Sequence, residues 1–480
     1  MTVTSEVSMP DRADSSAERA PAPGHRPRYR GSPYTRELIR LLRLHVPEGS
    51  SVLEVGTAQG GDVLAALAPR RGLGLSPSAE AVAEARARHP DLEFTAAELE
   101  GFDLGGETFD FIVVWAALGE ARDVQAMLDR VRKASRPDTR IVLAHPNSVW
   151  EPLLRLVTRI QIGRRAGELN WLSLQDLENL CRLADFEVVR KSGEVIFPFP
   201  IPGLAWVANR LLARMWPFTQ LGLIQLVVTR PIGPPPPALA RPRVSVIIPA
   251  RNERGNIAAA IQRTPEMEAG TEIVFVEGNS RDGTAEEIER QIALHPERNL
   301  KLVAQGSGIG KGDAVRKGFA AATGDILIIL DADLTVPPEL LPRFIAVLVS
   351  GKGELVSGTR LVYPMEDDAM RFLNKLGNRF FSFAFSWLLD QPIRDTLCGT
   401  KGLSRAHYDF IASQRSYFGD FDPFGDFDLL LGAAKANMKI VEVPVRYAAR
   451  SYGTTNISRF KHGWLLLQMS WFAWLRLKLR

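Results

Sequence analysis

The chain has little cysteine, no long apolar run and little net charge, and each shortage excludes a class of protein. Its 480 residues include only two cysteines, Cys181 and Cys398, so neither a disulfide framework nor a cysteine zinc site organises the fold. No run of about 18 apolar residues is present, so we expect no membrane-spanning helix. Residues 1–30 lack the apolar core of a secretory signal peptide, and the net charge of +4 gives little support for nucleic-acid binding. The sequence predicts a cytoplasmic protein that binds no nucleic acid.

Two segments of biased composition divide the chain. Residues 1–30 are rich in Ala, Pro, Ser and charge, which predicts a disordered leader. Residues 231–243 read PIGPPPPALARPR and cannot continue a helix or a central strand, because proline lacks the N–H group. This stretch predicts an extended spacer between two domains, over residues 31–230 and 244–480.

Both halves alternate short apolar runs with helical patterns. Such runs, when separated by helices, are typical of parallel strands that are covered on both faces. We therefore predict two tandem α/β domains, with ligands at the carboxyl ends of the strands. The expected strands are SVLEVG, RGLGL, FDFIVVW, RIVLAH, FEVVRK and LIQLVVTR in the first half, and VSVIIPA, TEIVFVEG, LKLVAQ, DILIILDAD and GELVSGTR in the second.

Polar residues follow four strands of the second domain. A lone Asp-x-Asp is more often a turn, but four strand ends at one sheet edge favour a ligand site. Carboxylates after the first two strands suit the hydrogen-bond donors of a nucleotide base and ribose, and two aspartates two residues apart suit a divalent ion. A lysine in a glycine-rich loop suits a phosphate. In chain order the candidates are Pro249, Glu253, Glu277, Asp282, Lys311, Asp331 and Asp333.

These residues resemble those of family 2 glycosyltransferases with the GT-A fold, over residues 243–480. The segments GTR (358–360), DTLCGTK (395–401) and VEVPVRYAARSYGTTN (441–456) are similar to dolichol-phosphate or polyprenyl-phosphate sugar transferases. The resemblance implies that Glu253 and Glu277 bind the nucleotide, and that Asp331 and Asp333 hold Mg²⁺ or Mn²⁺. The residues that it places near the donor or acceptor phosphates are Arg360, Lys401 and Arg450, and those near the acceptor as a catalytic acid or base are Asp426 or Asp428.

The second half departs from that family at two positions. Gly278 follows Glu277 where the family has a second acid, and Thr335 stands where a glutamine follows the second metal aspartate. The string Gln-x-x-Arg-Trp is absent, which argues against a processive polysaccharide synthase. The departures concern the nucleotide base and the metal, while the class of transferase is unchanged.

Two apolar segments favour a membrane surface without a span. Residues 371–389 are apolar with basic residues at their start, and residues 462–480 carry three tryptophans, several leucines and no acidic residue. Tryptophan and leucine on a basic helix are typical of binding to anionic lipid. An ordinary core helix with a cationic last turn is the alternative. We expect peripheral binding at the inner face of the membrane.

The first domain resembles class I S-adenosylmethionine-dependent methyltransferases over residues 34–230. In SVLEVGTAQGGD the residues Glu54, Gly56 and Gly60 match the cofactor loop, and Asp110 matches a later aspartate. The resemblance implies S-adenosylmethionine as a cofactor. Three positions depart from the pattern, at Ala58, Gly74 and Ala96, and Glu98 is the nearby substitute for the acid at the last of them.

Three hypotheses follow. The first is a metal-dependent glycosyltransferase that moves a sugar from a UDP- or GDP-type donor to a polyprenyl phosphate or a glycan. The second is a bifunctional enzyme that also methylates the sugar or the lipid. In the third, the first domain is a non-catalytic docking module that presents substrate to the transferase.

Overall fold

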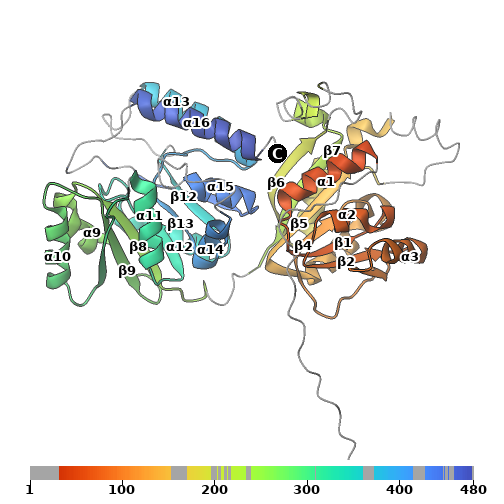
Figure 1. Cartoon of the computed structure of the whole chain (residues 1–480), viewed down its shortest axis with the longest axis horizontal. Helices are drawn as coiled ribbons and strands as arrows, with labels where there is room; N and C mark the ends of the chain where they lie inside the picture. Colours follow the sequence, from red (N-terminus) through yellow and green to blue (C-terminus); the bar gives the residue numbers. More distant parts are fainter. Residues whose placement is uncertain are drawn as a thin grey trace, which may run out of the picture.

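The computed structural model forms two α/β domains that lie side by side, which confirms the predicted fold class (Figure 1). The residues that it describes are 32–152, 170–195, 203, 207–209, 213, 218–233, 239–308, 310–360, 372–414, 427–446, 448, 452 and 459–477. The predicted leader lies outside these residues, as does part of the predicted spacer.

The first domain is built on a seven-stranded sheet whose strand order is β3-β2-β1-β4-β5-β7-β6. Strands β1 to β5 pair with one another in parallel, while β7 is antiparallel to both β5 and β6. The strands are β1 (Ser51–Val55), β2 (Arg71–Ser76), β3 (Glu93–Ala96), β4 (Phe109–Val114), β5 (Ser135–Pro146), β6 (Phe186–Glu194) and β7 (Ile224–Pro231).

Helices cover both faces of this sheet. One apolar cluster joins α1 (Pro33–His45), α2 (Asp62–Ala66) and α3 (Ala79–Arg88) to one face. A second joins α4 (Ala117–Glu120), α5 (Val124–Lys133) and α7 (Leu174–Leu183) to the other. The apolar faces of α1 and α5 follow the helical period, which is why these segments fold as helices against the sheet.

The second sheet has the order β10-β9-β8-β11-β13-β12-β14. Strands β8 to β11 pair in parallel, β13 is antiparallel to both its neighbours, and β12 pairs in parallel with β14. The strands are β8 (Val244–Ala250), β9 (Thr271–Glu277), β10 (Asn299–Ala304), β11 (Ile326–Ile329), β12 (Leu355–Thr359), β13 (Lys401–Ser404) and β14 (Ile440–Pro444).

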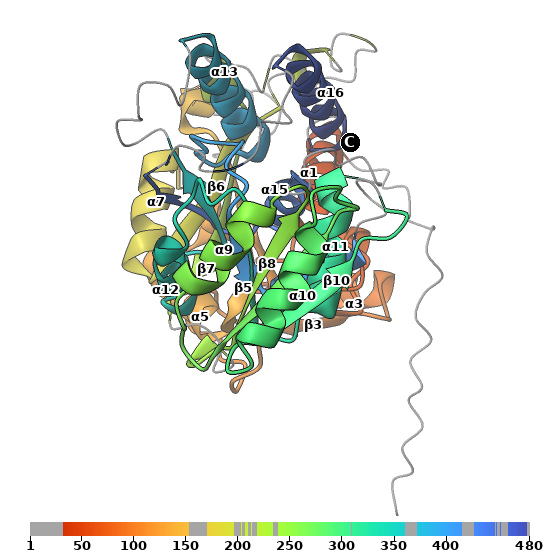
Figure 2. The same cartoon turned by 90° about the vertical axis from the view of Figure 1, so that its left-hand side faces the viewer.

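Helices also cover both faces of the second sheet. The first face packs against α9 (Ile257–Arg263), α10 (Thr284–Leu294) and α12 (Leu341–Val349). The opposite face packs against α11 (Gly310–Ala321), α13 (Phe372–Leu389), α14 (Arg405–Ser413), α15 (Phe427–Lys435) and α16 (Arg459–Leu477). Helices α13 and α16 contact each other and lie together at one end of the domain (Figure 2).

The prediction that the apolar runs are parallel strands is wrong for β7 and β6. Every residue of β7 is buried, because the strand lies inside the sheet and helices cover it. A continuous apolar run indicates that a strand is buried on both faces. An antiparallel strand inside a mixed sheet is buried in the same way as a parallel one, so the run does not give the direction of the strand. The sequence reading also missed β3, β13 and β14, which have four or five residues each and less apolar sequences.

Candidate active site

The carboxyl ends of β8, β9, β10 and β11 meet at one edge of the second sheet, as predicted. In the register, Ala250 at the end of β8 lies beside Glu277 at the end of β9, and Ala304 of β10 lies beside Glu277 on its other side. Strand β11 runs next to β8, with Ile329 opposite Ile247. The loops that follow these strands therefore surround a single region.

The loops after β8 and β9 are tied to each other. The backbone N–H of Glu253 donates to Thr284 Oγ1 at 3.0 Å, and that of Asn252 donates to Ser280 Oγ at 2.9 Å. Asn252 has a φ of 57°, in the left-handed region that asparagine tolerates better than most residues. These contacts hold the two candidate nucleotide-binding loops in one arrangement beside Pro249.

The three acids of these loops also organise the backbone. Glu277 Oε1 accepts the N–H of Ser280 at 2.6 Å, and Glu253 Oε2 accepts the side-chain amide of Asn256 at 2.6 Å. Asp282 accepts the hydroxyl of Thr284 at 2.5 Å and its N–H at 3.1 Å. Burial opposes its ionisation, but the hydrogen bonds from the Thr284 hydroxyl and from the N–H groups of Arg254 and Thr284 hold its pKa below its usual range. Each acid thus has a local structural role, and the nucleotide-binding roles stay predictions.

Asp331 and Lys311 form an ion pair at the centre of the edge. Lys311 Nζ donates to Asp331 Oδ1 at 2.5 Å, and the two side chains are 29% and 31% exposed. Burial opposes the ionisation of Asp331, but the ammonium groups of Lys311 and Lys401 and the guanidinium of Arg360 hold its pKa below the usual range. We predicted that Lys311 contacts a phosphate, and in the structure its ammonium contacts the candidate metal ligand.

Gly399 passes close to this ion pair. A Cβ at position 399 would clash with the Asp331 carboxylate and the Lys311 ammonium, so any other residue here would have to displace this ion pair. The glycine belongs to the segment DTLCGTK, which follows the long insertion after β12. This explains why a glycine stands between Cys398 and Thr400.

Arg360 is held by an acid that the sequence reading did not single out. Arg360 Nε donates to Asp395 Oδ2 at 2.6 Å and Arg360 Nη2 donates to Asp395 Oδ1 at 2.8 Å, so the pair is bidentate. The backbone N–H of Arg360 also donates to Asp395 Oδ2 at 3.0 Å. Asp395 is the first residue of DTLCGTK, and that position was the signal that could have found it. Lys401, the last residue, is fully buried and donates to the Cys398 carbonyl at 2.5 Å.

The donor set offers a divalent ion two carboxylates. Asp333 Oδ1 accepts the backbone N–H of Thr335 at 3.1 Å and its hydroxyl at 2.8 Å, which fixes the side chain. Within the described residues, no group of three or more His, Cys, Asp or Glu side chains could hold a metal ion. Two carboxylate ligands fit Mg²⁺ or Mn²⁺ when substrate phosphates and water supply the others.

Three other predicted residues are not placed at this edge. Asp426 and Arg450 lie outside the described residues. Asp428 lies in the first turn of α15, at the helix N-terminus that favours acidic side chains. Its role near an acceptor stays a prediction.

In the first domain, the acid of the predicted cofactor loop is enclosed by protein side chains. Glu54 is fully buried, and its carboxylate accepts the indole N–H of Trp115 at 2.7 Å and the hydroxyl of Thr57 at 3.2 Å. Burial raises the pKa of Glu54 to about 7, against the hydrogen bonds from Trp115 and Thr57, which lower it. Both carboxylate oxygens therefore face protein groups.

Side chains also fill the space beside the glycines of the first domain. A Cβ at Gly74, the position of the missing ribose-binding acid, would lie 2.5 Å from both the Phe94 ring and the Thr57 hydroxyl. At Gly60 it would lie 2.9 Å from the side chain of Arg88, and at Gly56 it would clash with Ala117. Glu98, the expected substitute, is exposed in the turn after β3. The described residues do not fit S-adenosylmethionine, since position 74 offers no carboxylate to the ribose and the Glu54 carboxylate is already held by Trp115 and Thr57.

Comparisons with known proteins match the two domains separately. The family model "Glycosyl transferase family 2" matches residues 245–412, and the model "Methyltransferase domain" matches residues 27–191. A dolichol-phosphate mannosyltransferase of Pyrococcus furiosus is 28% identical over 220 residues, which cover 45% of this chain and 59% of that protein. An undecaprenyl-phosphate 4-deoxy-4-formamido-L-arabinose transferase of Pectobacterium carotovorum is 29% identical over 222 residues, covering 45% and 63%.

The curated relatives are matched only in part, since the chain spans between 38% and 63% of their length. Among solved structures, a glucosyl-3-phosphoglycerate synthase of Mycobacterium tuberculosis has a TM-score of 0.38 and 20% identity, and the match covers 51% of this chain and 81% of that one. The chain thus carries a domain of glycosyl transferase family 2 in its second half, after a domain that resembles methyltransferases.

Proposed function

We propose that the protein transfers a sugar from a nucleoside diphosphate-sugar to a polyprenyl phosphate at a membrane surface. The observation that carries the proposal is the grouping of acids and cations at one sheet edge, beside two helices with exposed aromatic residues. The similarity to polyprenyl-phosphate sugar transferases supports the same acceptor class.

The nucleotide would lie against the loops after β8 and β9. Glu253 and Glu277 offer carboxylates to the base and ribose, and Asp282 fixes the loop that follows Glu277. Because Gly278 replaces a second acid, fewer carboxylates face the nucleotide than in the related family. The donor is of the UDP or GDP type in this proposal.

Asp331 and Asp333 would hold a divalent ion together with the donor diphosphate. The ion, when bound, offsets the negative charge that grows on the leaving diphosphate. Lys311 would then exchange its contact with Asp331 for a phosphate oxygen, since the ammonium already lies at this edge. The chain's own contribution is to hold the Asp331 carboxylate ionised, as its lowered pKa indicates.

The acceptor phosphate would lie near Arg360 and Lys401. Both cations lower the pKa of Asp331, so their charges act on the same region. A phosphate acceptor is already ionised at neutral pH and needs no general base, whereas a glycan hydroxyl would need one within hydrogen-bond reach. Asp426 and Asp428 are the candidate bases for that alternative acceptor.

Helices α13 and α16 would bind the membrane surface. On α16, the residues Leu466, Met469 and Ala473 are buried in the core, while Trp464 and Trp471 are 63% and 62% exposed. On α13, Phe383 is 74% exposed. The two interpretations of the tail, a core helix and a membrane-binding helix, are therefore compatible, since one face of α16 lies in the core and the other presents tryptophans. Exposed aromatic residues beside basic ones suit a bilayer surface, and no helix in the described residues is long and apolar enough to cross one.

The first domain would take part without S-adenosylmethionine in this proposal. The burial of Glu54 and the glycine at position 74, which offers no carboxylate, support that view. The bifunctional hypothesis then loses its cofactor.

The test uses the full chain, UDP- and GDP-sugars, Mg²⁺ or Mn²⁺, and anionic vesicles with or without undecaprenyl phosphate. We expect a sugar-linked lipid that forms only with polyprenyl phosphate and one donor class, and that is absent for Asp333→Asn. Transfer to a soluble glycan but not to the lipid would overturn the acceptor assignment. The absence of transfer from every donor would overturn the function.

A further inference from the structure

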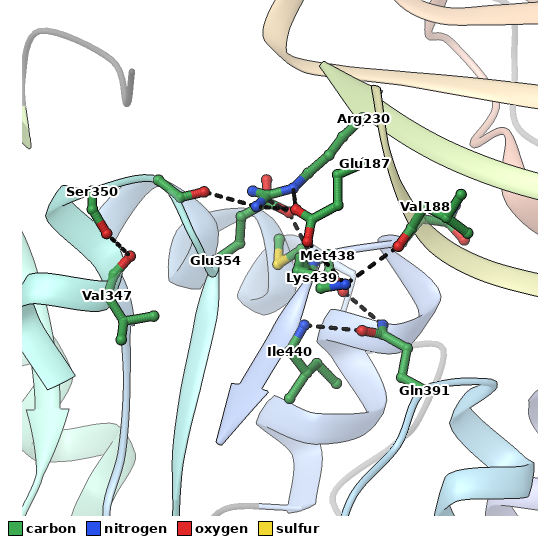
Figure 3. A network of polar contacts seen from close by, with 12 residues as sticks. Glu187, Val188, Arg230, Val347, Ser350, Glu354, Gln391, Met438, Lys439 and Ile440 are labelled. Carbon is green, nitrogen blue, oxygen red and sulfur yellow. Dashed lines mark hydrogen bonds and ion pairs between the residues drawn. The ribbon is translucent and has the colours of Figure 1, made fainter. Parts of the chain in front are cut away.

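The two domains meet at buried charges. Arg140 Nη2 of β5 donates to Glu354 Oε1 of the second domain at 2.5 Å, and these side chains are 5% and 7% exposed. Arg230 of β7 lies 3.6 Å from Glu354 Oε2 and donates to the Gly351 carbonyl at 2.7 Å (Figure 3). Burial opposes the ionisation of Glu354, but Arg140, His407 and Arg230 lower its pKa to about 2.

A second set of contacts joins the edge strands of the two sheets. Arg190 of β6 forms an ion pair with Asp390, the residue that follows α13. Lys439, which precedes β14, lies 3.1 Å from Glu187 and donates to the Val188 carbonyl at 3.3 Å (Figure 3). Buried ion pairs cost much when one partner is removed, because the other charge stays without compensation. The interface therefore fixes three points of the second domain, at 354, 390 and 439.

Each of these three points is connected to the Arg360–Asp395 pair, either along the chain or through hydrogen bonds. Strand β12 starts directly after Glu354 and ends directly before Arg360. Strand β14 starts after Lys439, and its Glu442 accepts the backbone N–H groups of Arg394 and Asp395, both at 2.9 Å. The segment from Asp390 reaches Asp395 after five residues.

We propose that Arg140, Arg190 and Arg230 of the first domain are positioning residues of the transferase site. Arg140 and Arg230 hold the start of β12 through Glu354, and Arg190 holds the 390–395 segment through Asp390. Together with the contacts of Lys439, which hold the start of β14, they keep the guanidinium of Arg360 against Asp395. The first domain is in this sense a structural part of the second domain's site, and its role needs no cofactor. The assignment rests on the proposed function, which gives Arg360 a phosphate to bind.

The test compares Arg140→Gln and Arg190→Gln with the intact full chain. We expect the acceptor KM to rise roughly three- to thirtyfold, the range for residues that couple through a packed network. The affinity for UDP or GDP alone should change less than about twofold, because Glu253 and Glu277 lie on loops after β8 and β9. Hydrogen exchange at the backbone N–H of Arg360 should accelerate, since that group donates to Asp395.

Arg136→Gln is the matched control, because Arg136 pairs with Asp110 and Asp138 inside the first domain. It should leave both the acceptor KM and the Arg360 exchange unchanged. The swap Arg190→Asp with Asp390→Arg should restore much of what Arg190→Gln loses, which a general loss of stability would not allow. If Arg140→Gln does not fold, the Arg190 variants decide.

The proposal is overturned if the folded variants keep the acceptor KM and the Arg360 exchange of the intact chain. It is also overturned if Arg136→Gln produces the same changes as the interface variants. If the intact chain transfers no sugar, the proposed function fails, and the exchange of the Arg360 N–H still tests the positioning role by itself.

Discussion

Each domain places an acid beside the same crevice of its sheet, on the first strand in one domain and after the fourth strand in the other, and surrounds it differently. In each sheet, the first four strands along the chain are ordered third, second, first, fourth, so the strand order reverses beside the first strand. Ligands of open α/β sheets bind at this point. In the first domain, Glu54 of β1 is fully buried under Trp115. In the second, Asp331 after β11 stays 31% exposed and pairs with Lys311.

The difference shows that topology gives the place of a site, while side-chain size decides whether a ligand can enter. In the first domain, Trp115 and Thr57 cover the Glu54 carboxylate, and the Phe94 ring, which is only 2% exposed, packs against Gly74. Glycines and charged side chains line the crevice of the second domain, with Gly399 beside the ion pair. Function must therefore be argued from the crevice of each domain and not from the fold.

The largest effect should follow from removing charge at the open crevice. Asp331→Asn and Asp333→Asn keep the side-chain shape but weaken the hold on a divalent ion and on the diphosphate, so transfer should fall roughly 10²- to 10³-fold or more. The melting temperature should change little. A sugar-transfer assay with calorimetry checks both. Metal-dependent turnover at the normal rate in both variants would contradict the site assignment.

The buried Glu54 should instead make the stability of the fold depend on pH. The pKa of Glu54 is raised to about 7 from 4.5, so its stabilising effect is complete below pH 4.5 and is lost as the pH rises through about 7. The unfolding free energy should fall by up to about 3 kcal/mol across this window, and Glu54→Gln should remove that fall. Urea unfolding at pH 5 and pH 8 measures it. An equal pH dependence in both proteins would show that Glu54 is ionised when folded.

The exposed tryptophans should control binding to vesicles. Trp464→Ser with Trp471→Ser removes apolar area from the outer face of α16 and leaves Leu466 and Met469 in the core. Partitioning to anionic vesicles should fall about tenfold or more. Phe410→Ser is the control, since Phe410 is exposed on α14. If the intact chain ignores phosphatidylglycerol vesicles at low salt, the membrane role is wrong.

The smallest expected effect is that of S-adenosylmethionine. Because Trp115 and Thr57 cover Glu54 and position 74 lacks an acid, the cofactor at millimolar concentration should not shift the melting temperature of the full chain. A ligand at a hundred times its Kd would stabilise the domain by about 2.7 kcal/mol. A stabilisation of this size would overturn the contrast between the two crevices. UDP and GDP with Mg²⁺ serve as the positive comparison.

Local patterns were enough to predict the strand ends and the acids that follow them. Apolar runs mark the strands, and a loop residue directly after a run is placed by the strand itself, which is why Glu277 and Asp331 lie where we expected them. The parallel pairing of β8, β9, β10 and β11 was also predictable from the alternation of runs and helices. The roles assigned to these acids remain predictions.

Contacts between distant residues could not be predicted in this way. Arg360 and Asp395 are 35 residues apart, and Arg190 and Asp390 are 200 residues apart, so no periodicity connects either pair. The insertion of β13 between β11 and β12 is also a long-range pairing. The position of the Phe94 ring beside Gly74 depends on how β2 and β3 pack. The departures from the cofactor pattern indicated it only indirectly.

The two faces of α16 have a consequence for thermodynamics. Leu466, Met469 and Ala473 belong to the core of the domain, while Trp464 and Trp471 lie on the outer face of the same helix. A bilayer that binds the outer face of the folded helix more strongly than it binds the unfolded chain acts as a ligand of the native state. Mass action then requires that lipid raise the melting temperature of the transferase domain in proportion to the logarithm of the accessible lipid surface.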